Sequence, residues 1–260
     1  MAESELNGSE SVRSVVRAVS ILEAIAAANG DRIGIQNLAK ATKLSKATAY
    51  RIATTLMNLE YIEKDENNKY SLGMKLITLS SVILNNLQVL NVAKEELVSL
   101  SQEVELTAHL GTLDGNDLLY LSKANTNASI QTTSYVGQRS YVHSTSLGKA
   151  LCAQLTSDEV LQILDDKGMP RFTDHTITDP AAYLKDLEQV RCRGYAIDNE
   201  ENEKFVRCVA APVFDHSGKT IAAISVSGLI VHVPEEKLVA LAEIVRGRAS
   251  KISAKMGYHT

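Results

Sequence analysis

The sequence predicts an α+β protein in which a small N-terminal module and a larger C-terminal domain flank a helical segment. Residues 12–72 combine apolar residues at helical spacing with a hairpin pattern, residues 74–105 hold a nearly heptad apolar register, and the remainder alternates short strands with helices. We expect the three parts to span 11–73, 74–105 and 106–258. A chain of 260 residues fits about two globular domains.

The N-terminal module is expected to contain three helices. The first spans 12–28, where Asn29-Gly30-Asp31 ends the apolar run, and a short second helix spans 36–43. Ser45 suits the N-cap of a third helix over 46–59, because its hydroxyl can accept from the free amides of the first turn. Two alternating tetrads around a turn-forming DENN follow as strands, at 61–64 and 69–72. This is the outline of a winged helix-turn-helix.

The segment 74–105 contains neither Gly nor Pro and is expected to be helical, with a break near Asn91. A helix of this length must bury its apolar stripe, either on its own domain or on a second subunit. Both kinds of packing remain open. The stripe consists of Leu76, Ile83, Leu90, Leu97 and Val104 at seven-residue steps, with Leu79, Ala93 and Leu100 in the partner seam and Asn86 interrupting it.

The C-terminal domain is expected to hold an antiparallel sheet with helices packed on it, because consecutive strands are joined by tight turns. The candidate strands are 107–113, 117–123, 130–136, 208–214 and 221–227. The candidate helices are 146–154, 157–167, 180–193 and 234–256.

The net charge of −4 conceals two regions of opposite sign. Residues 11–75 carry ten Lys and Arg against six Asp and Glu, whereas residues 76–260 carry seventeen against twenty-two. A basic module of this kind is typical of nucleic-acid binding. We therefore expect double-stranded DNA as a partner of the first domain.

The composition excludes several other classes of protein. With 45% hydrophobic and 22% charged residues, it is neither disordered nor collagen-like. The three cysteines form no CxxC and no zinc-finger spacing, so we expect no metal and no cofactor. Their odd number, without a signal sequence, fits a reducing, cytoplasmic location. The N-terminus lacks a signal sequence, and the longest apolar stretch, 221–231, is far shorter than the ~20 residues of a membrane helix, so no membrane partner is expected.

The third helix carries the candidate DNA interface. If Ala49, Ile52, Ala53, Leu56 and Leu59 face the core, a polar set points outward near the helix start, where recognition helices meet base edges. An ordinary solvated helix face is the alternative, but the preceding helix, the cap, the wing and the local charge favour DNA. The expected contacts are Ser45, Lys46, Ala47, Thr48, Tyr50, Arg51 and Thr54, with Lys64 and Lys69 on the wing.

Enzymatic activity is not expected, and no residue is assigned as catalytic. A hydrolase-like constellation can be drawn from His143, Ser144, Asp198 and Cys208, but Ala223 stands where a GxSxG elbow would need its first glycine. Phosphate-loop, dinucleotide-binding and HExxH motifs are also absent. A hydrolase-like enzyme and a ligand sensor that does not act on DNA remain the alternatives.

The motifs of both domains resemble the IclR (isocitrate lyase regulator) family of bacterial transcription factors. LSKATAYR at 44–51 is similar to the start of its recognition helix, and LEYI at 59–62 to the residues leading into its wing. GQR at 137–139, HSTSLGKA at 143–150 and AISVSG at 223–228 resemble segments of its second domain, as do Gly194, Asp198, Glu201 and 208–215. The resemblance implies a GAF- or profilin-like sheet domain.

The resemblance also implies that the second domain binds a small carboxylate effector. The segments 109–114, 208–215 and 251–259 resemble the subgroup that represses 2-keto-3-deoxygluconate (pectin degradation) genes, whereas Ser140-Tyr141-Val142 differs and leaves the keto acid open. The implied effector contacts are Ser146, Leu147, Gly148, Asp198, Cys208, Ser225 and Ser227.

Elementary chemistry agrees with this assignment. Residues 146–149 open a helix whose free amides suit an anion, and Ser225 and Ser227 share one strand face. Satisfied core hydroxyls are the alternative for the two serines. Glu201 is expected to be a structural ion-pair partner of Lys204 or Arg207.

These inferences together predict a sequence-specific regulator, expected to be a repressor, of a sugar-acid catabolic operon. We expect a homodimer or homotetramer on a palindromic operator, with half-sites one helical turn (about 34–36 Å) apart.

Overall fold

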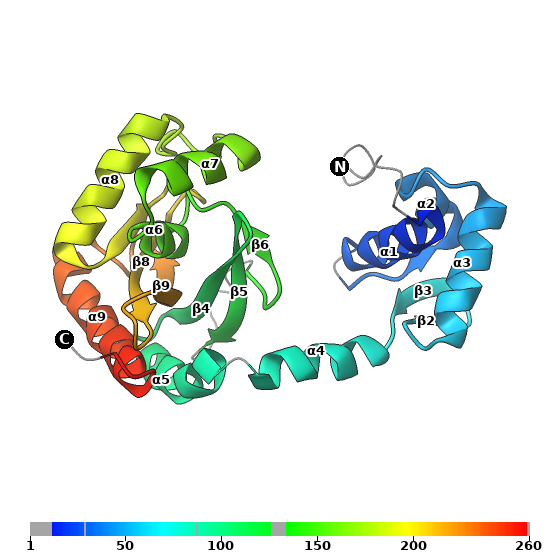
Figure 1. The fold of residues 1–260 in the computed structure, drawn as a ribbon, viewed down its shortest axis with the longest axis horizontal. Helices are drawn as coiled ribbons and strands as arrows, with labels where there is room; N and C mark the ends of the chain where they lie inside the picture. Colours follow the sequence, from blue (N-terminus) through cyan, green and yellow to red (C-terminus); the bar gives the residue numbers. More distant parts are fainter. Residues whose placement is uncertain (1–11, 29, 87, 126–133, 259–260) are drawn as a thin grey trace. The chain divides into compact units, whose positions relative to one another are not determined.

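The computed structural model describes residues 12–28, 30–86, 88–125 and 134–258. Its contacts divide the chain into two compact units, Met1–Asn86 and Leu87–Thr260. Figure 1 shows the helices and strands of each unit. The helical segment expected over 74–105 is shared between them, because α4 (Lys75–Asn86) lies in the first unit and α5 (Gln88–Val104) in the second.

The first unit packs three helices against a small antiparallel sheet of order β1-β3-β2, which confirms the expected winged helix-turn-helix. Ile21, Leu38 and Ala53, one from each helix, are fully buried in a single core. Strand β1 was not expected, because two residues are too few to show an alternating pattern. The elements before α4 are α1 (Arg13–Ala26), β1 (Ile33–Gly34), α2 (Ile35–Ala41), α3 (Lys46–Asn58), β2 (Ile62–Lys64) and β3 (Lys69–Leu72).

A tight turn joins α2 to α3. Lys43 adopts a left-handed conformation with φ of 54°, and the Leu44 amide donates to the Ala39 carbonyl at 3.0 Å, which closes the C-terminus of α2. Ser45 then begins α3, and its Oγ accepts from the Thr48 amide at 3.2 Å. The expected N-cap is therefore confirmed.

The apolar stripe of the helical segment is buried within the second unit along α5. Of its expected members on α5, Ala93, Leu97 and Leu100 are buried in the same core as α9 and the sheet, and Leu90 and Val104 pack partly buried against it. No break occurs at Asn91, which lies inside α5 (Gln88–Val104). On α4, by contrast, Ile77 and Leu79 are 59% and 47% exposed within the chain.

The second unit is built on an antiparallel sheet of order β6-β5-β4-β9-β8-β7. Helices α5 and α9 cover one face, and α6, α7 and α8 cover the other (Figure 1). The elements after α5 are β4 (Thr107–Asp114), β5 (Asp117–Ala124), β6 (Arg139–Ser140), α6 (Ser146–Cys152), α7 (Ser157–Lys167), α8 (Pro180–Arg193), β7 (Ala196–Asn199), β8 (Val206–Phe214), β9 (Thr220–Leu229), a 3₁₀ turn (Glu235–Lys237) and α9 (Leu238–Lys255).

Three expectations for this unit need correction. The strand expected over 130–136 falls partly outside the described residues, and its described part, 134–136, is not a strand. The sheet edge is instead the two-residue strand β6, which pairs with β5. Strand β7 was missed because it is short, and the helix expected over 234–256 begins with a 3₁₀ turn.

Candidate functional site

The N-terminal half of α3 presents an exposed face. Lys46, Ala47, Tyr50 and Arg51 are all exposed, as expected, and Tyr50 is 53% exposed. The face therefore offers two cations, a phenol and a methyl group within two turns. These are groups suited to phosphate, guanine and thymine in a major groove.

Three residues of α3 or its C-cap depart from the expected division into core and surface. Thr48 is half-buried with its Oγ1 2.8 Å from Ser45 Oγ, and half-buried Thr54 donates its hydroxyl to the Tyr50 carbonyl at 2.9 Å. Both hydroxyls thus serve the helix itself. Leu59, expected in the core, is 53% exposed because it is the C-cap residue.

The wing carries exposed lysines at both expected positions, Lys64 on β2 and Lys69 on β3. Asp65 shapes the turn between them, because its Oδ1 accepts from the Lys69 amide at 2.8 Å. Arg32 was not expected here; its Nη1 lies 3.6 Å from Asp65 Oδ2, which brings a third cation to the wing. Only the pairing of β1 with β3 reveals that proximity.

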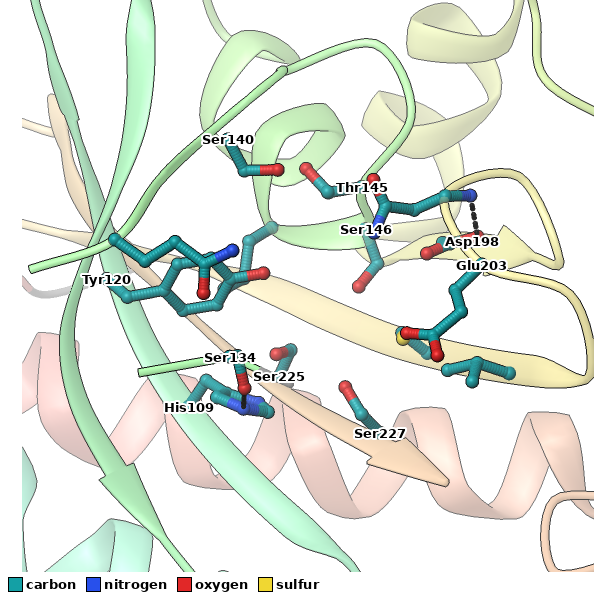
Figure 2. A pocket seen from close by; sticks show the side chains of 15 residues that line it. His109, Tyr120, Ser134, Ser140, Thr145, Ser146, Asp198, Glu203, Ser225 and Ser227 are labelled. Carbon is teal, nitrogen blue, oxygen red and sulfur yellow. Dashed lines mark hydrogen bonds between the residues drawn. The ribbon is translucent and has the colours of Figure 1, made fainter. Parts of the chain in front are cut away.

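A pocket lies on the face of the second sheet that α6 covers. The non-protein space in the pocket and its mouth, open solvent included, is about 550 Å³. Figure 2 shows Ser146 on one side of this space, Ser225 and Ser227 on the other, and the carboxylates of Asp198 and Glu203 beside them. Six of the seven expected effector residues line it, namely Ser146, Leu147, Asp198, Cys208, Ser225 and Ser227.

The strand register explains why these residues meet. Asp198 on β7 pairs with Cys208 on β8, which pairs with Ser227 on β9. Ser225, two residues earlier, pairs with His109 on β4. Directly paired residues project from the same face of a sheet, so side chains far apart in sequence form two adjacent polar rows.

Gly148, the seventh expected residue, does not line the pocket. A Cβ at this position would lie 2.3 Å from the Cα of Val142, so the glycine permits close packing of α6 instead. The anion site expected from the amides of 146–149 also has fewer free amides than expected. Thr145 accepts from the Gly148 amide through its hydroxyl at 3.1 Å and from the Lys149 amide through its carbonyl at 3.0 Å.

The structure adds nine residues to the expected lining. His109 and Tyr120 come from adjacent strands and form an edge-to-face ring contact at 5.4 Å. The alternation of β4 could have identified His109, whereas the loop residues had no signal in the sequence. The additions are His109, Tyr120, Ser134, Gln138, Ser140, Thr145, Asn202, Glu203 and Val206.

Asp198 is the most strongly perturbed acid in the pocket. Its side chain is buried, and its Oδ1 accepts from the amides of Glu201 at 2.8 Å and Asn202 at 3.4 Å. Burial raises the pKa of Asp198 to about 7, with a smaller raising contribution from Glu201, while the two amides and Lys149 act in the opposite direction. Asp198 can therefore exist as acid or carboxylate near neutral pH.

Lys149 anchors the loop that carries these acids. It is 1% exposed, and its Nζ contacts Glu201 Oε1 at 2.6 Å, Asp186 Oδ2 at 2.9 Å and the Ile197 carbonyl at 3.1 Å. Glu201 was expected to be a structural ion-pair partner, which is confirmed. Its partner is Lys149 rather than Lys204 or Arg207, because α6 packs on β7.

His109, Cys208 and Tyr120 in the pocket favour their neutral forms. Burial lowers the pKa of His109 to about 3, and its Nε2 lies 2.8 Å from Ser134 Oγ. Burial also raises the pKa of Cys208 and Tyr120. At neutral pH the imidazole, thiol and phenol are all uncharged.

The hydrolase-like constellation does not assemble. His143 Nε2 lies 3.1 Å from the Pro170 carbonyl, and Ser144 donates to Asn202 Oδ1 at 3.1 Å. Neither side chain is among the described residues that line the pocket with Asp198 and Cys208.

The described residues also include no helix long and apolar enough to cross a membrane.

Comparisons with known proteins agree with both halves of this description. Residues 14–66 match the IclR helix-turn-helix domain, and residues 81–254 match the bacterial transcriptional regulator IclR C-terminal domain. The HTH-type transcriptional regulator KdgR of Escherichia coli K12 is 38% identical over 100% of this chain and 98% of its own length. KdgR of Dickeya chrysanthemi is 36% identical over 96% of this chain and 82% of its own length.

Solved structures show the same architecture. The crystal structure of the Thermotoga maritima IclR is 31% identical, covers 95% of this chain and 99% of that chain, and has a TM-score of 0.79. The C-terminal domain of E. coli KdgR is 39% identical over 65% of this chain and 99% of its own, with a TM-score of 0.59. The chain therefore belongs to the IclR family of bacterial transcriptional regulators, and it is a KdgR-like DNA-binding regulator rather than an enzyme.

Proposed function

We propose that this regulator represses a sugar-acid catabolic operon and releases its operator when a keto acid such as 2-keto-3-deoxygluconate occupies the pocket. The observation that carries the proposal is the lining of the pocket, where the hydroxyls of Ser146, Ser225 and Ser227 and the carboxylate of Asp198 converge. Such groups suit the hydroxyls and oxo groups of a sugar acid. The 38% identity with KdgR supports the same class of effector.

DNA recognition is proposed to use α3 and the wing. Arg51 suits a bidentate contact with guanine, while Lys46, Lys64, Lys69 and Arg32 suit the phosphates. The other proposed contacts are Ser45, Ala47, Thr48, Tyr50 and Thr54, with Ser45 and the two threonines acting mainly through helix geometry. A palindromic operator with half-sites about 34–36 Å apart would match two such modules.

A homodimer or tetramer is proposed as the active form, acting in the cytoplasm where its operator lies. Two copies supply the two recognition helices that a palindrome requires. Exposed apolar residues on the first unit, Val12, Val15 and Val19 with Ile77 and Leu79, offer area for such an association. Sedimentation should show a dimer or larger species at micromolar concentration, and a stable monomer would contradict this.

The effector is proposed to act through the residues 74–105 that connect the DNA-binding and effector domains. Helix α5 ends one residue before Glu105, close in sequence to β4, which contributes His109 to the pocket. An effector shifts the balance between two arrangements only by binding one of them more tightly. We expect it to favour the arrangement that does not match the operator.

Calorimetry and mobility shift test this function. The full chain should bind 2-keto-3-deoxygluconate, Ser225→Ala should weaken that binding, and the acid should release the chain from DNA of its own upstream region. Arg171→Ala, in the second unit and outside the pocket lining, is the matched control and should behave as the wild type. Unchanged affinity in Ser225→Ala would contradict the proposed site.

A further inference from the structure

The charge of the pocket is unusual for a site that takes an acid. Its described lining contains two carboxylates, Asp198 and Glu203, and neither Lys nor Arg. An effector carboxylate would add a third negative charge to a partly buried space. Close like charges in such a space force one acid to take up a proton. The question is which group does so.

Two lysines lie near the pocket but outside its described lining. Lys149 is held between Glu201 and Asp186, and Lys123 donates to the backbone carbonyl of Ser134 at 2.6 Å, which does not neutralise its charge. His109 supplies no charge, because burial keeps its imidazole neutral. No Lys or Arg of the described lining can therefore pair with the effector's charge, and a proton on a lining acid is the compensation that the pocket itself offers.

Asp198 is the acid placed to carry that proton. It lies in the polar row with Cys208 and Ser227, and its Oδ1 accepts from two backbone amides. The Cys208 thiol is a further hydrogen-bond partner of the carboxyl, and the hydrogen is placed on Oδ2. The groups that face it are the neutral thiol of Cys208, the neutral phenol of Tyr120, the acids Glu201 and Glu203, and Lys149. The low solvation of this row favours the uncharged form of the carboxyl.

We propose that Asp198 receives the effector's carboxylate as the neutral acid, so that each bound effector brings one proton into the pocket. The O–H of Asp198 donates to a carboxylate oxygen of the effector, and the proton comes from solvent wherever Asp198 is ionised in the free protein. This inference rests on the proposed function, and it adds a regulatory consequence: derepression by the acid strengthens as the pH falls toward neutrality.

The pH dependence of binding follows from linkage. Below the pKa of the free pocket, about 7, Asp198 already holds its proton and the affinity is constant. Above it, the proton must be taken up on binding, and the affinity falls by about tenfold for each further pH unit. The affinity falls rather than rises with pH because the pKa of Asp198 is higher in the complex than in the free protein.

Isothermal titration calorimetry of the full chain with 2-keto-3-deoxygluconate tests the inference. Titrations at pH 5.5, 7.5 and 8.5, each in two buffers of different ionisation enthalpy, give the number of protons taken up. We expect almost none at pH 5.5 and about one at pH 8.5, with about tenfold weaker affinity at pH 8.5 than at pH 7.5.

Two variants test which residue takes up the proton. Asp198→Asn keeps an oxygen for the Glu201 amide and offers an N–H to the effector, so its affinity should not change with pH and its proton uptake should vanish. Glu203→Gln, the matched change in the same pocket, should still take up about one proton at pH 8.5, whatever its affinity. Thermal unfolding confirms that each variant is folded.

The outcomes separate the inference from the function on which it rests. Binding by the wild type without proton uptake at pH 8.5 overturns the inference alone and requires no variant. Proton uptake that persists in Asp198→Asn, or is lost in Glu203→Gln, assigns the proton to another group and also overturns it. Absence of binding at every pH refutes the effector assignment together with the inference.

Discussion

Lys149→Met removes the cation at the centre of the ion cluster behind the pocket while keeping a side chain of similar length. The lysine is 1% exposed and contacts Glu201 at 2.6 Å, Asp186 at 2.9 Å and the Ile197 carbonyl at 3.1 Å. Without it, two acids lose their partner inside the protein. Breaking a buried pair in this way costs about 3–5 kcal/mol of unfolding free energy.

The loss should depend on pH in a defined direction. The pKa of Glu201 is already raised, chiefly by burial, and Lys149 opposes that shift. In the variant the folded pKa rises further above the unfolded value. A carboxyl whose pKa is higher in the folded than in the unfolded protein lowers the free energy of unfolding as the pH rises from the unfolded-state pKa to the folded-state pKa. The stability deficit of the variant should therefore be smaller at pH 5 than at pH 8.

Chemical denaturation at pH 5 and pH 8, monitored by a probe in the second unit, measures both the loss of stability and its dependence on pH. Lys167→Met is the matched control, because Lys167 is 36% exposed and pairs with Asp117 at 2.8 Å on the surface. Its loss should be about 0–1 kcal/mol at either pH. A Lys149→Met deficit below that of the control, or one that grows toward acid pH, would refute this account of the cluster.

Other substitutions test the remaining assignments. Arg51→Ala should abolish specific operator binding in a salt-dependent mobility shift, whereas Arg171→Ala should retain it; equal loss in both would contradict the assignment of α3. Gly148→Ala places a Cβ 2.3 Å from the Val142 backbone and should cost at least about 1–3 kcal/mol in thermal or chemical unfolding. Gly247→Ala is its counterpart, because an added Cβ meets nothing within 4 Å in the middle of α9, and it should stabilise the chain by up to about 1 kcal/mol. Similar effects for the two glycines would show that close packing at Gly148 is not what requires a glycine there.

Local sequence patterns were sufficient to predict most of the helices and long strands. The bounds of α7 and α8 agree with the sequence-based expectation, because each begins with a side-chain cap and carries a glycine immediately after its last residue. Strands β1, β6 and β7 were not expected, because each is only two to four residues long. Strands β2 and β3 are as short, but the turn-forming DENN between two alternating tetrads indicated them. Leu59 was misassigned because helical spacing says nothing about where the helix ends.

The same distinction applies to the pocket, where the sequence could predict some lining residues and not others. Ser225 and Ser227 could be placed on one face from their spacing, and both line it. The alternation of β4 could have indicated His109, but that it meets Tyr120 and Ser225 depends on which strands are neighbours and in which register. Glu203 could not be placed, because it lies in the loop between β7 and β8. The resemblance to a family supplied Asp198, but not the burial that perturbs its pKa.

The sequence by itself determined the basic winged module, the acidic sheet domain and the family, since each is written in periodicity, charge and local motifs. Only the tertiary structure decided that α5 buries its stripe on its own domain, that Lys149 pairs with Glu201, and that the described lining of the pocket holds two acids and neither Lys nor Arg. The physical reason is that burial and pairing arise from contacts between distant residues, which no local pattern records.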